Sequence, residues 1–196
     1  MRNVKKMGTI LVCLLVVQAG LSQNYKGAMP NLRTILKVDG GTQGLGLSFE
    51  TPVTPEFLLE VETGLGGGYV VEKQRVRYLT NYDDPSLVGA VKGSFYFNRE
   101  RRYENGNTLM QNSGNFVGLG VKYASSGLIK NLEPHNILLT HLHLGLKRAF
   151  DKNWSFSGLV GVGYAHNLDW KSGEDYPGGE VKITHLLEIK ISYILN

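Results

Sequence analysis

Residues 179–196 read GEVKITHLLEIKISYILN, and this stretch decides the fold class. Apolar side chains occupy every second position from Val181 to Leu195, and only His185 interrupts them. The intervening positions include Glu188 and Lys190, so charges of both signs alternate with the apolar set. An extended strand places alternate side chains on opposite faces. A strand with one apolar and one charged face is typical of a transmembrane β-barrel.

The first residues, MRNVKKMGTILVCLLVVQAGLSQ, have the pattern of an export signal. A basic start precedes an apolar core over Met7–Val17, and small residues lead to a cut before Gln23. We therefore expect residues 1–22 to be a cleaved signal peptide and residues 23–196 to form one outer-membrane barrel domain. The only cysteine, Cys13, lies in the leader, so the mature chain would contain no internal disulfide.

The charge gives no indication of nucleic-acid binding. The whole chain has 21 Lys and Arg residues against 17 Asp and Glu. Three of the basic residues belong to the leader, so the mature balance is 18 − 17, or +1. After the leader, the chain has no apolar run as long as a membrane helix needs. A membrane location would therefore depend on strands.

Four short segments alternate glycine with apolar residues and end on an aromatic: Gly44–Phe49, Gly64–Tyr69, Gly118–Tyr123 and Gly158–Tyr164. A dinucleotide-binding loop also has closely spaced glycines, but it requires a helix directly after the loop. No amphipathic helix follows these segments. A narrow barrel explains them better, because small residues must lie beside long ones in its interior.

The pattern predicts an all-β fold, an eight-stranded antiparallel up-and-down transmembrane β-barrel. The expected strands are Asn31–Val38, Gln43–Glu50, Glu56–Val70, Ser86–Asn98, Gly114–Ala124, Asn136–Phe150, Trp154–His166 and the terminal stretch. Turns are expected at Asp39–Gly41, Thr51–Pro55 and Asp151–Asn153. With both termini in the periplasm, the longer connections 71–85, 125–135 and 167–179 lie outside the cell. The connection 99–113 does not fit this scheme, because it is long and basic although it should be periplasmic.

The alternation also predicts which side chains face the lumen and which face the lipid. We expect a lumen charge network of Arg33, Lys37, Glu60, Glu62, Lys92, Lys122, Lys147, Glu188 and Lys190, in which basic groups outnumber acidic ones. Buried charges must pair or stay hydrated, so we expect a plugged, wet lumen and no open pore. Alternatively, several of these residues lie at the solvated rims. Interfacial aromatics are expected at Tyr69, Tyr123, Trp154, Tyr164 and Tyr193.

Histidine is the residue type best suited to catalysis or metal binding here. His141 and His143 share one face of a strand, and His166 lies near three acidic residues of an expected outer loop: Asp169, Glu174 and Asp175. Neither group has a known metal-ligand spacing. We expect lumen-filling polar groups and a solvated loop, with no metal, cofactor or catalytic residue. Loop aromatics form either a binding surface or headgroup contacts: Tyr78, Tyr82, Trp170 and Tyr176.

Two other functions remain open at this point. Some eight-stranded outer-membrane barrels modify lipids, as lipid A deacylases or acyltransferases do, and use a His and a Ser near the membrane face. The candidates for such a site are His166 and His185, with Ser172 and Glu174 in the adjoining loop. The other alternative is a lipocalin-like periplasmic binder, whose apolar face would point inward.

The stretch 99–116, RERRYENGNTLMQNSGNF, resembles a segment of the small outer-membrane β-barrel proteins of Bacteroidota. In that family an aromatic strand end leads into a basic stretch, a Gly-Asn-Thr and an Asn-Ser-Gly-Asn. The matching residues are Phe95, Tyr96, Phe97, Arg101, Arg102, Gly106, Asn107, Thr108, Asn112, Ser113, Gly114 and Asn115. The resemblance implies an outer-membrane barrel, in a family mostly of unknown activity, and carries over no catalytic residue.

The sequence thus favours a non-enzymatic outer-membrane barrel of a Gram-negative bacterium. Its expected partners are outer-membrane lipid and, during biogenesis, the barrel-assembly machinery, with no nucleic acid. Its expected role is envelope integrity or surface contact through the outer loops. An extracellular ligand is not identified by the sequence.

Overall fold

The computed structural model describes residues 29–71, 76–79, 84–129, 136–168 and 181–195. The expected signal peptide lies outside these residues. So do Tyr82, Asp169, Trp170, Ser172, Glu174, Asp175 and Tyr176.

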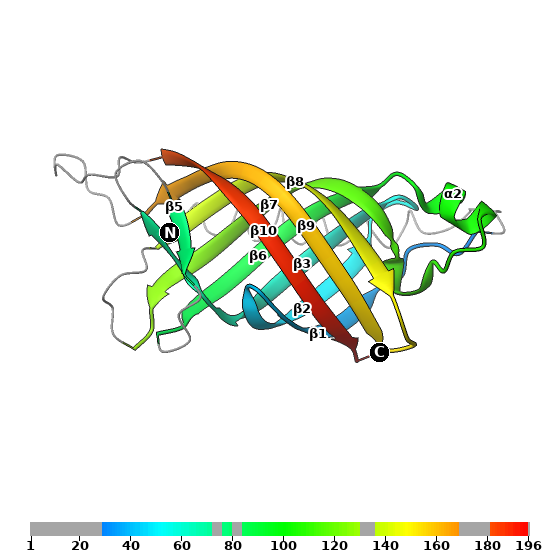
Figure 1. Cartoon of the computed structure of the whole chain (residues 1–196), viewed down its shortest axis with the longest axis horizontal. Coiled ribbons are helices and arrows are strands. Elements are labelled where there is room, and N and C mark those ends of the chain that lie inside the picture. The colour runs from blue at the N-terminus through cyan, green and yellow to red at the C-terminus, as the bar shows by residue number, and fades with distance from the viewer. Residues whose placement is uncertain (1–28, 72–75, 80–83, 130–135, 169–180, 196) are drawn as a thin grey trace, which may run out of the picture.

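Eight antiparallel strands close into a barrel, which confirms the expected all-β fold (Figure 1). The barrel strands are β1 (Ile35–Gly41), β2 (Gly44–Pro52), β3 (Phe57–Gly66), β6 (Ser86–Tyr96), β7 (Gly114–Gly127), β8 (Ile137–Ala149), β9 (Trp154–Asn167) and β10 (Val181–Ile194). Each barrel strand pairs with the next one along the chain, and β1 closes the ring by pairing with β10. The topology is therefore up-and-down.

The two ends of the barrel differ. A small hairpin of β4 (Gly68–Val71) and β5 (Val76–Leu79) lies at one end, here called the hairpin end. The connection from β6 to β7 lies at the other end, called the cap end (Figure 1). This connection, residues 97–113, contains helix α2 (Arg99–Glu104) and the short 3-10 helix η1 (Met110–Asn112), and we call it the cap loop.

The prediction for the first strand was wrong. The strand begins at Ile35 instead of Asn31, and Asp39–Gly41 continues it instead of forming a turn. The turn is at Thr42 and Gln43, and Gly44 follows with a φ of +110°. Glycine adopts this backbone conformation without the steric cost that a β-carbon brings.

The third strand also differs from its expected range of Glu56–Val70. It leaves the barrel at Gly66, and the chain continues as β4 in the separate hairpin. A β-carbon on Gly66 would lie 1.7 Å from the carbonyl oxygen of Gln43. Only glycine allows the two chain segments to approach this closely.

The ladder that closes the barrel is short. β1 and β10 share five residue pairs, from Lys37 opposite Ile194 to Gly41 opposite Lys190. β9 and β10 share thirteen. Backbone pairing along the barrel is therefore least extensive where the ring closes.

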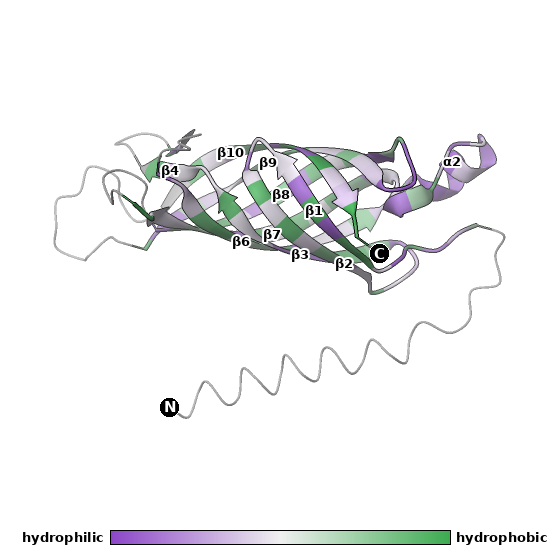
Figure 2. Ribbon diagram, turned by 90° about the horizontal axis from the view of Figure 1, so that it is seen from below, coloured by the Kyte–Doolittle hydropathy of each residue, from purple (hydrophilic) through white to green (hydrophobic). Residues whose placement is uncertain are grey.

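Hydrophobic and hydrophilic positions alternate along the barrel strands (Figure 2). The large apolar residues of these strands are mostly exposed on the outside of the barrel, while most of the charged residues are buried inside it. Leu45, Leu119, Leu144 and Ile183 are among the large outward-facing residues, and Leu45 is 71% exposed. Within the described ranges, no helix is long and apolar enough to cross a membrane.

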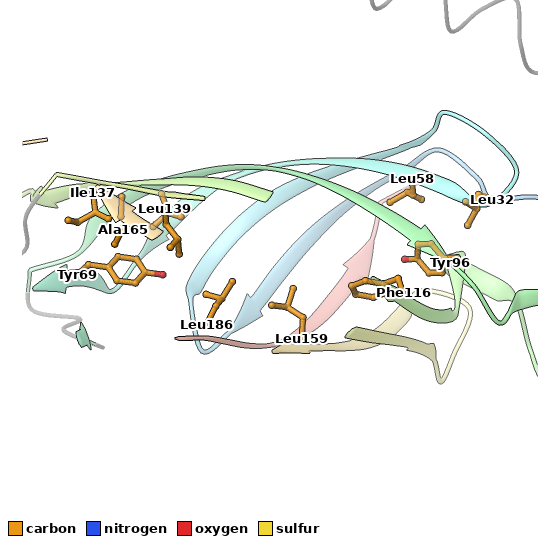
Figure 3. Close-up of a cluster of buried hydrophobic side chains, with 12 residues drawn as sticks. Leu32, Leu58, Tyr69, Tyr96, Phe116, Ile137, Leu139, Leu159, Ala165 and Leu186 are labelled. Carbon is orange, nitrogen blue, oxygen red and sulfur yellow. The ribbon is translucent and has the colours of Figure 1, made fainter. Parts of the chain in front are cut away.

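Most of the buried apolar side chains gather toward the two ends of the interior, with Leu159 and Leu186 between them. Tyr69, Ile137 and Leu139 lie toward the hairpin end, and Tyr96 and Phe116 lie toward the cap end (Figure 3). A lumen lined by eight strands is just wide enough for such side chains to fill it.

Candidate functional site

A network of ion pairs fills the centre of the barrel. On the side toward the cap end, Glu50 accepts hydrogen bonds from Lys37 Nζ at 2.6 Å and from Lys147 Nζ at 2.5 Å. Lys37 Nζ also lies 3.1 Å from Glu60 Oε1. These side chains come from β1, β2, β3 and β8, so the ion pairs connect opposite walls of the barrel.

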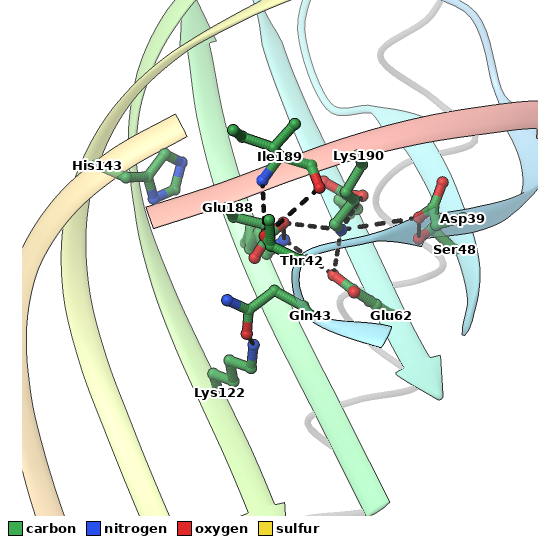
Figure 4. A network of polar contacts seen from close by, with 12 residues as sticks. Asp39, Thr42, Gln43, Ser48, Glu62, Lys122, His143, Glu188, Ile189 and Lys190 are labelled. Atoms are coloured by element: carbon green, nitrogen blue, oxygen red, sulfur yellow. Dashed lines mark hydrogen bonds and ion pairs between the residues drawn. The ribbon is translucent and has the colours of Figure 1, made fainter. Parts of the chain in front are cut away.

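Lys190 is the centre of the other half of the network (Figure 4). Its Nζ lies 2.6 Å from Glu62 Oε2, 2.8 Å from Glu188 Oε1 and 3.7 Å from Asp39 Oδ2. Lys92 Nζ is shared between the same two glutamates, at 2.8 Å from Glu62 and 2.6 Å from Glu188. Since Asp39 is on β1 and Lys190 on β10, one ion pair crosses the short closing ladder.

Eight of the nine residues predicted for the lumen network lie there, and Arg33 does not. Arg33 precedes β1, and its side chain is exposed at the cap end. The alternation places side chains on a face only within a strand, and the strand begins two residues later than Arg33.

Among the side chains that the structure describes, the expected basic excess is not found. Five lysines face the lumen: Lys37, Lys92, Lys122, Lys147 and Lys190. Five carboxylates face it as well: Asp39, Glu50, Glu60, Glu62 and Glu188. The prediction omits Asp39 and Glu50, and it places Asp39 in a turn. Glu50 could have been found, because it alternates with the outward-facing Phe49 in the expected second strand.

Lys122 binds differently from the other lysines. Its Nζ donates a hydrogen bond to Gln43 Oε1, and it lies 5.9 Å from the ring centroid of Tyr69. Gln43 Nε2 donates to the carbonyl oxygen of Leu187 at 3.1 Å. The turn between β1 and β2 thus places Gln43 in the lumen, where Gln43 links Lys122 of β7 to the backbone of β10.

His141 and His143 face the lumen, as expected, and are buried. Their Nδ1 atoms are 3.3 Å apart, and His143 Nε2 lies 3.3 Å from Ser94 Oγ. Glycines on β7 leave room for the rings, because a β-carbon on Gly118 or Gly120 would lie within 2.7 Å of an imidazole nitrogen. The glycine-rich repeats therefore accommodate bulky polar groups on the neighbouring strand, in agreement with the expected interior.

The Ser94–His143 distance would suit a nucleophile and its base. Both side chains, however, lie within the filled lumen, and the cavity beside His143 has a volume of 20 Å³. A second cavity, beside Lys190, measures 10 Å³. These spaces are of the order of one water molecule. A substrate therefore has no room beside this pair.

Tyr69 fills the hairpin end of the lumen, so its prediction as an interfacial aromatic was wrong. Tyr69 is 2% exposed, and its ring packs edge-on against Tyr78 with centroids 5.2 Å apart. The hydroxyl of Tyr78 accepts a hydrogen bond from the backbone nitrogen of Gly67 at 3.0 Å. Because β4 has left the barrel wall, the alternation of β3 no longer sets the direction of Tyr69.

The other four predicted aromatics are on the outside of the barrel. Trp154 and Tyr193 contact each other near the cap end, with ring centroids 5.0 Å apart. Tyr123 and Tyr164 lie toward the hairpin end of β7 and β9. The hydroxyl of Tyr123 donates to Asn136 Oδ1 at 3.0 Å. Their contact with a membrane interface stays a prediction.

The cap loop closes the opposite end, which explains its unexpected length. Asn112 Nδ2 donates hydrogen bonds to Glu50 Oε2 and to the carbonyl oxygen of Arg33, both at 2.9 Å. Gln111 Nε2 donates to the carbonyl oxygens of Asp151 and Lys152 at 2.7 and 2.6 Å. The loop therefore binds the segment before β1, the turn after β8 and the ion-pair network.

Arg99 attaches α2 to the same end of the barrel. Its Nη2 donates to the carbonyl oxygen of Pro30 at 2.6 Å, and its Nη1 donates to that of Ser113 at 3.5 Å. Burial lowers the pKa of the Arg99 guanidinium, because a low-dielectric surrounding disfavours its charged form. Several residues of the stretch 99–116 form hydrogen bonds at this end. Asn112 bonds to Glu50, Ser113 bonds to Met110, and Arg148 bonds to Gly114 and Asn115.

Two of the four residues considered for a lipid-modifying site, His166 and His185, belong to the described residues. They do not pair with each other in the β9–β10 ladder, because His166 is opposite Val181 and His185 is opposite Val162, four positions along. Ser172 and Glu174 lie outside the described residues. In the described ranges, no three His, Cys, Asp or Glu side chains form a group that could hold a metal ion.

Comparison of the chain with protein-family models, curated proteins and solved structures finds no significant match.

Proposed function

We propose that the mature chain is a non-enzymatic integral protein of a Gram-negative outer membrane, with its apolar girdle in contact with lipid and its lumen closed. The observation that carries this proposal is the inverted distribution of polarity. Of the side chains that the structure describes, ten charged ones lie inside the barrel, while leucine, valine, isoleucine and phenylalanine cover its outside.

Such a surface is unfavourable in water. Soluble monomers rarely expose large contiguous apolar patches, whereas membrane barrels place an apolar band outward and polar groups inward. All backbone polar groups along a closed barrel wall can pair between strands, which a bilayer requires. The leader and the resemblance of residues 99–116 to Bacteroidota barrels favour the same location.

The filled lumen favours a structural or contact role over conduction. In the described part of the chain, five lysines and five carboxylates occupy the centre, Tyr69 fills the hairpin end and the cap loop closes the other end. The role we propose is envelope integrity, or surface contact through the loops at the hairpin end. Outer-membrane lipid and the barrel-assembly machinery are the partners that this role implies.

Envelope fractionation combined with a gel-shift assay tests the proposal. We expect the protein in the outer-membrane fraction, with different migration before and after boiling, because a folded barrel resists detergent. In planar bilayers we expect no steady conductance. Recovery of the protein in the soluble periplasm would contradict the location, and a steady porin-like current would contradict the closed lumen.

A further inference from the structure

The outer face of the barrel carries an arginine among its apolar side chains. Of the Asp, Glu, Lys and Arg side chains that the structure describes on the eight barrel strands, Arg148 of β8 is the one that points outward. It continues the outward row of Leu144 and Leu146, and the exposed Phe150 follows it beyond the strand. A charge beside apolar surface needs water or a counter-ion.

Hydrogen bonds hold the guanidinium of Arg148 against the barrel. Its Nη1 donates to the carbonyl oxygens of Gly114 and Lys147 at 2.9 and 2.8 Å, and its Nη2 donates to Asn115 Oδ1 at 2.5 Å. These bonds use three of its five N–H groups. The Nε has no hydrogen-bond partner among the described residues, and it is not fully buried. The side chain is therefore fixed in place and keeps donors for a ligand.

A second arginine lies beside the first. Arg102 of α2 is half-buried, and its Nη2 donates to the carbonyl oxygen of Thr108 at 3.1 Å. Within the described ranges, Arg102 is the charged group close enough to act on Arg148, and the two like charges repel each other. No carboxylate of the described residues offsets this repulsion at Arg148. An anion between the two guanidinium groups would be attracted by both.

The two arginines lie at the level of the aromatic pair near the cap end. Arg148 is opposite Phe156 in the β8–β9 ladder, two residues from Trp154, which contacts Tyr193. Trp and Tyr concentrate where the hydrocarbon of a bilayer meets the lipid headgroups. In the proposed membrane location, lipid phosphates therefore lie beside Arg148. Charge and depth together favour a lipid phosphate as the counter-ion.

We propose that Arg102 and Arg148 form a binding site for the phosphate group of a membrane glycerophospholipid, on the outside of the barrel at its cap end. The two guanidinium groups donate charge-assisted hydrogen bonds to the phosphate oxygens. The acyl chains of the lipid contact Leu144 and Leu146. The inference rests on the proposed membrane location, and it makes the cap loop, which carries Arg102, a contact between the barrel and the lipid surface.

Native mass spectrometry of the folded mature protein, released from maltoside micelles, measures the binding of added lipid. The probe is dioctanoyl phosphatidylglycerol, and dioctanoylglycerol is the comparison with the same chains and no phosphate. We expect the unmodified protein to bind the phospholipid about tenfold more tightly or better, because two charge-assisted contacts are made. Arg102→Gln combined with Arg148→Gln should remove this preference. Equal affinity of the unmodified protein for the two lipids, or an unchanged preference in the double variant, would overturn the proposal.

The matched control is Arg101→Gln, since Arg101 is an exposed arginine of the same helix, and it should keep the preference. Arg102→Gln alone should reduce the preference about threefold. This variant changes no residue of a barrel strand, so the test does not depend on the folding of the Arg148 variant.

An excess of inorganic phosphate distinguishes a lipid from a free anion. It should leave the phospholipid bound, whereas complete displacement would identify free phosphate as the ligand and overturn the lipid assignment. Heat-modifiable migration of each sample shows whether the barrel is folded. Loss of the preference in a folded barrel is therefore distinct from failure of the barrel proposal.

Discussion

Glu50 accepts hydrogen bonds from three donors that come from distant parts of the chain. Lys37 is on β1, Lys147 on β8 and Asn112 in η1. Removing Glu50 leaves Lys147 buried without an ion-pair partner among the described residues, and an uncompensated buried charge costs more than the pair contributes when intact.

We therefore expect Glu50→Ala to lower the free energy of unfolding by about 3–5 kcal/mol, the range for breaking a buried ion pair. Urea titration of the folded barrel in micelles measures this. Glu100→Ala is the control, because Glu100 is exposed on α2, and it should change stability by less than about 0.5 kcal/mol. Equal unfolding midpoints for the two variants would contradict the importance of Glu50.

Alternation predicts the face of a residue but not where its strand begins or ends. Lys92, Lys147 and Glu188 lie well inside long strands, and their inward direction was predicted correctly. Arg33 and Tyr69 lie beyond the end of a barrel strand, where hydrogen bonds and packing set their positions. Which side chains meet within the lumen depends on how the eight strands are staggered relative to one another. The sequence of a single strand does not determine this stagger.

Among the elements of the barrel, β1 has the shortest pairing with a neighbouring strand. It shares five residue pairs with β10, while β9 shares thirteen with β10 and thirteen with β8. Local opening requires less free energy where fewer backbone hydrogen bonds must break.

Hydrogen exchange followed by mass spectrometry should accordingly find faster exchange in β1 than in β9. The measurement uses the folded protein in micelles, at a pH and temperature where the barrel is intact. Uniform protection of β1 and β9 would mean that the barrel opens only as a whole, and the short ladder would then have no dynamic consequence.

Strand number and direction could be predicted because each hairpin alternates between apolar and polar residues. The boundaries of β1 and β3 could not, since both depend on close approaches between distant segments. Gly66 fits against Gln43, and Gly41 lies so near β10 that a β-carbon would be 2.0 Å from the carbonyl oxygen of Ile189. The cap loop was recognised as unusual, but its contacts join residues up to 79 positions apart.

At the scale of the whole molecule, the proposed membrane location predicts that the cost of a charged substitution on the apolar exterior depends on its position along the barrel axis. Leu144 lies on the outer face of β8, opposite Val160 of β9 and between the two aromatic groups. Phe150 is exposed just beyond the cap end of β8.

In lipid vesicles we expect Leu144→Lys to lower the free energy of unfolding by about 2–4 kcal/mol, and Phe150→Lys by about 0–1 kcal/mol, because a lysine costs most at the bilayer midplane. Urea titration from the vesicle-bound state gives both values. A protein whose exterior faces water would tolerate the two changes equally, and that result would contradict membrane residence.

The contacts of the cap loop have a consequence for the order in which parts of the barrel fold. It lies at the middle of the chain, yet it fastens Arg33, which is synthesised early, to Lys152, which is synthesised late. These hydrogen bonds of the cap loop cannot all form until β8, the sixth strand of the barrel, and the turn after it are in place. Closure of the cap end is thus a late event in folding, and until it happens the partly formed barrel stays open at that end.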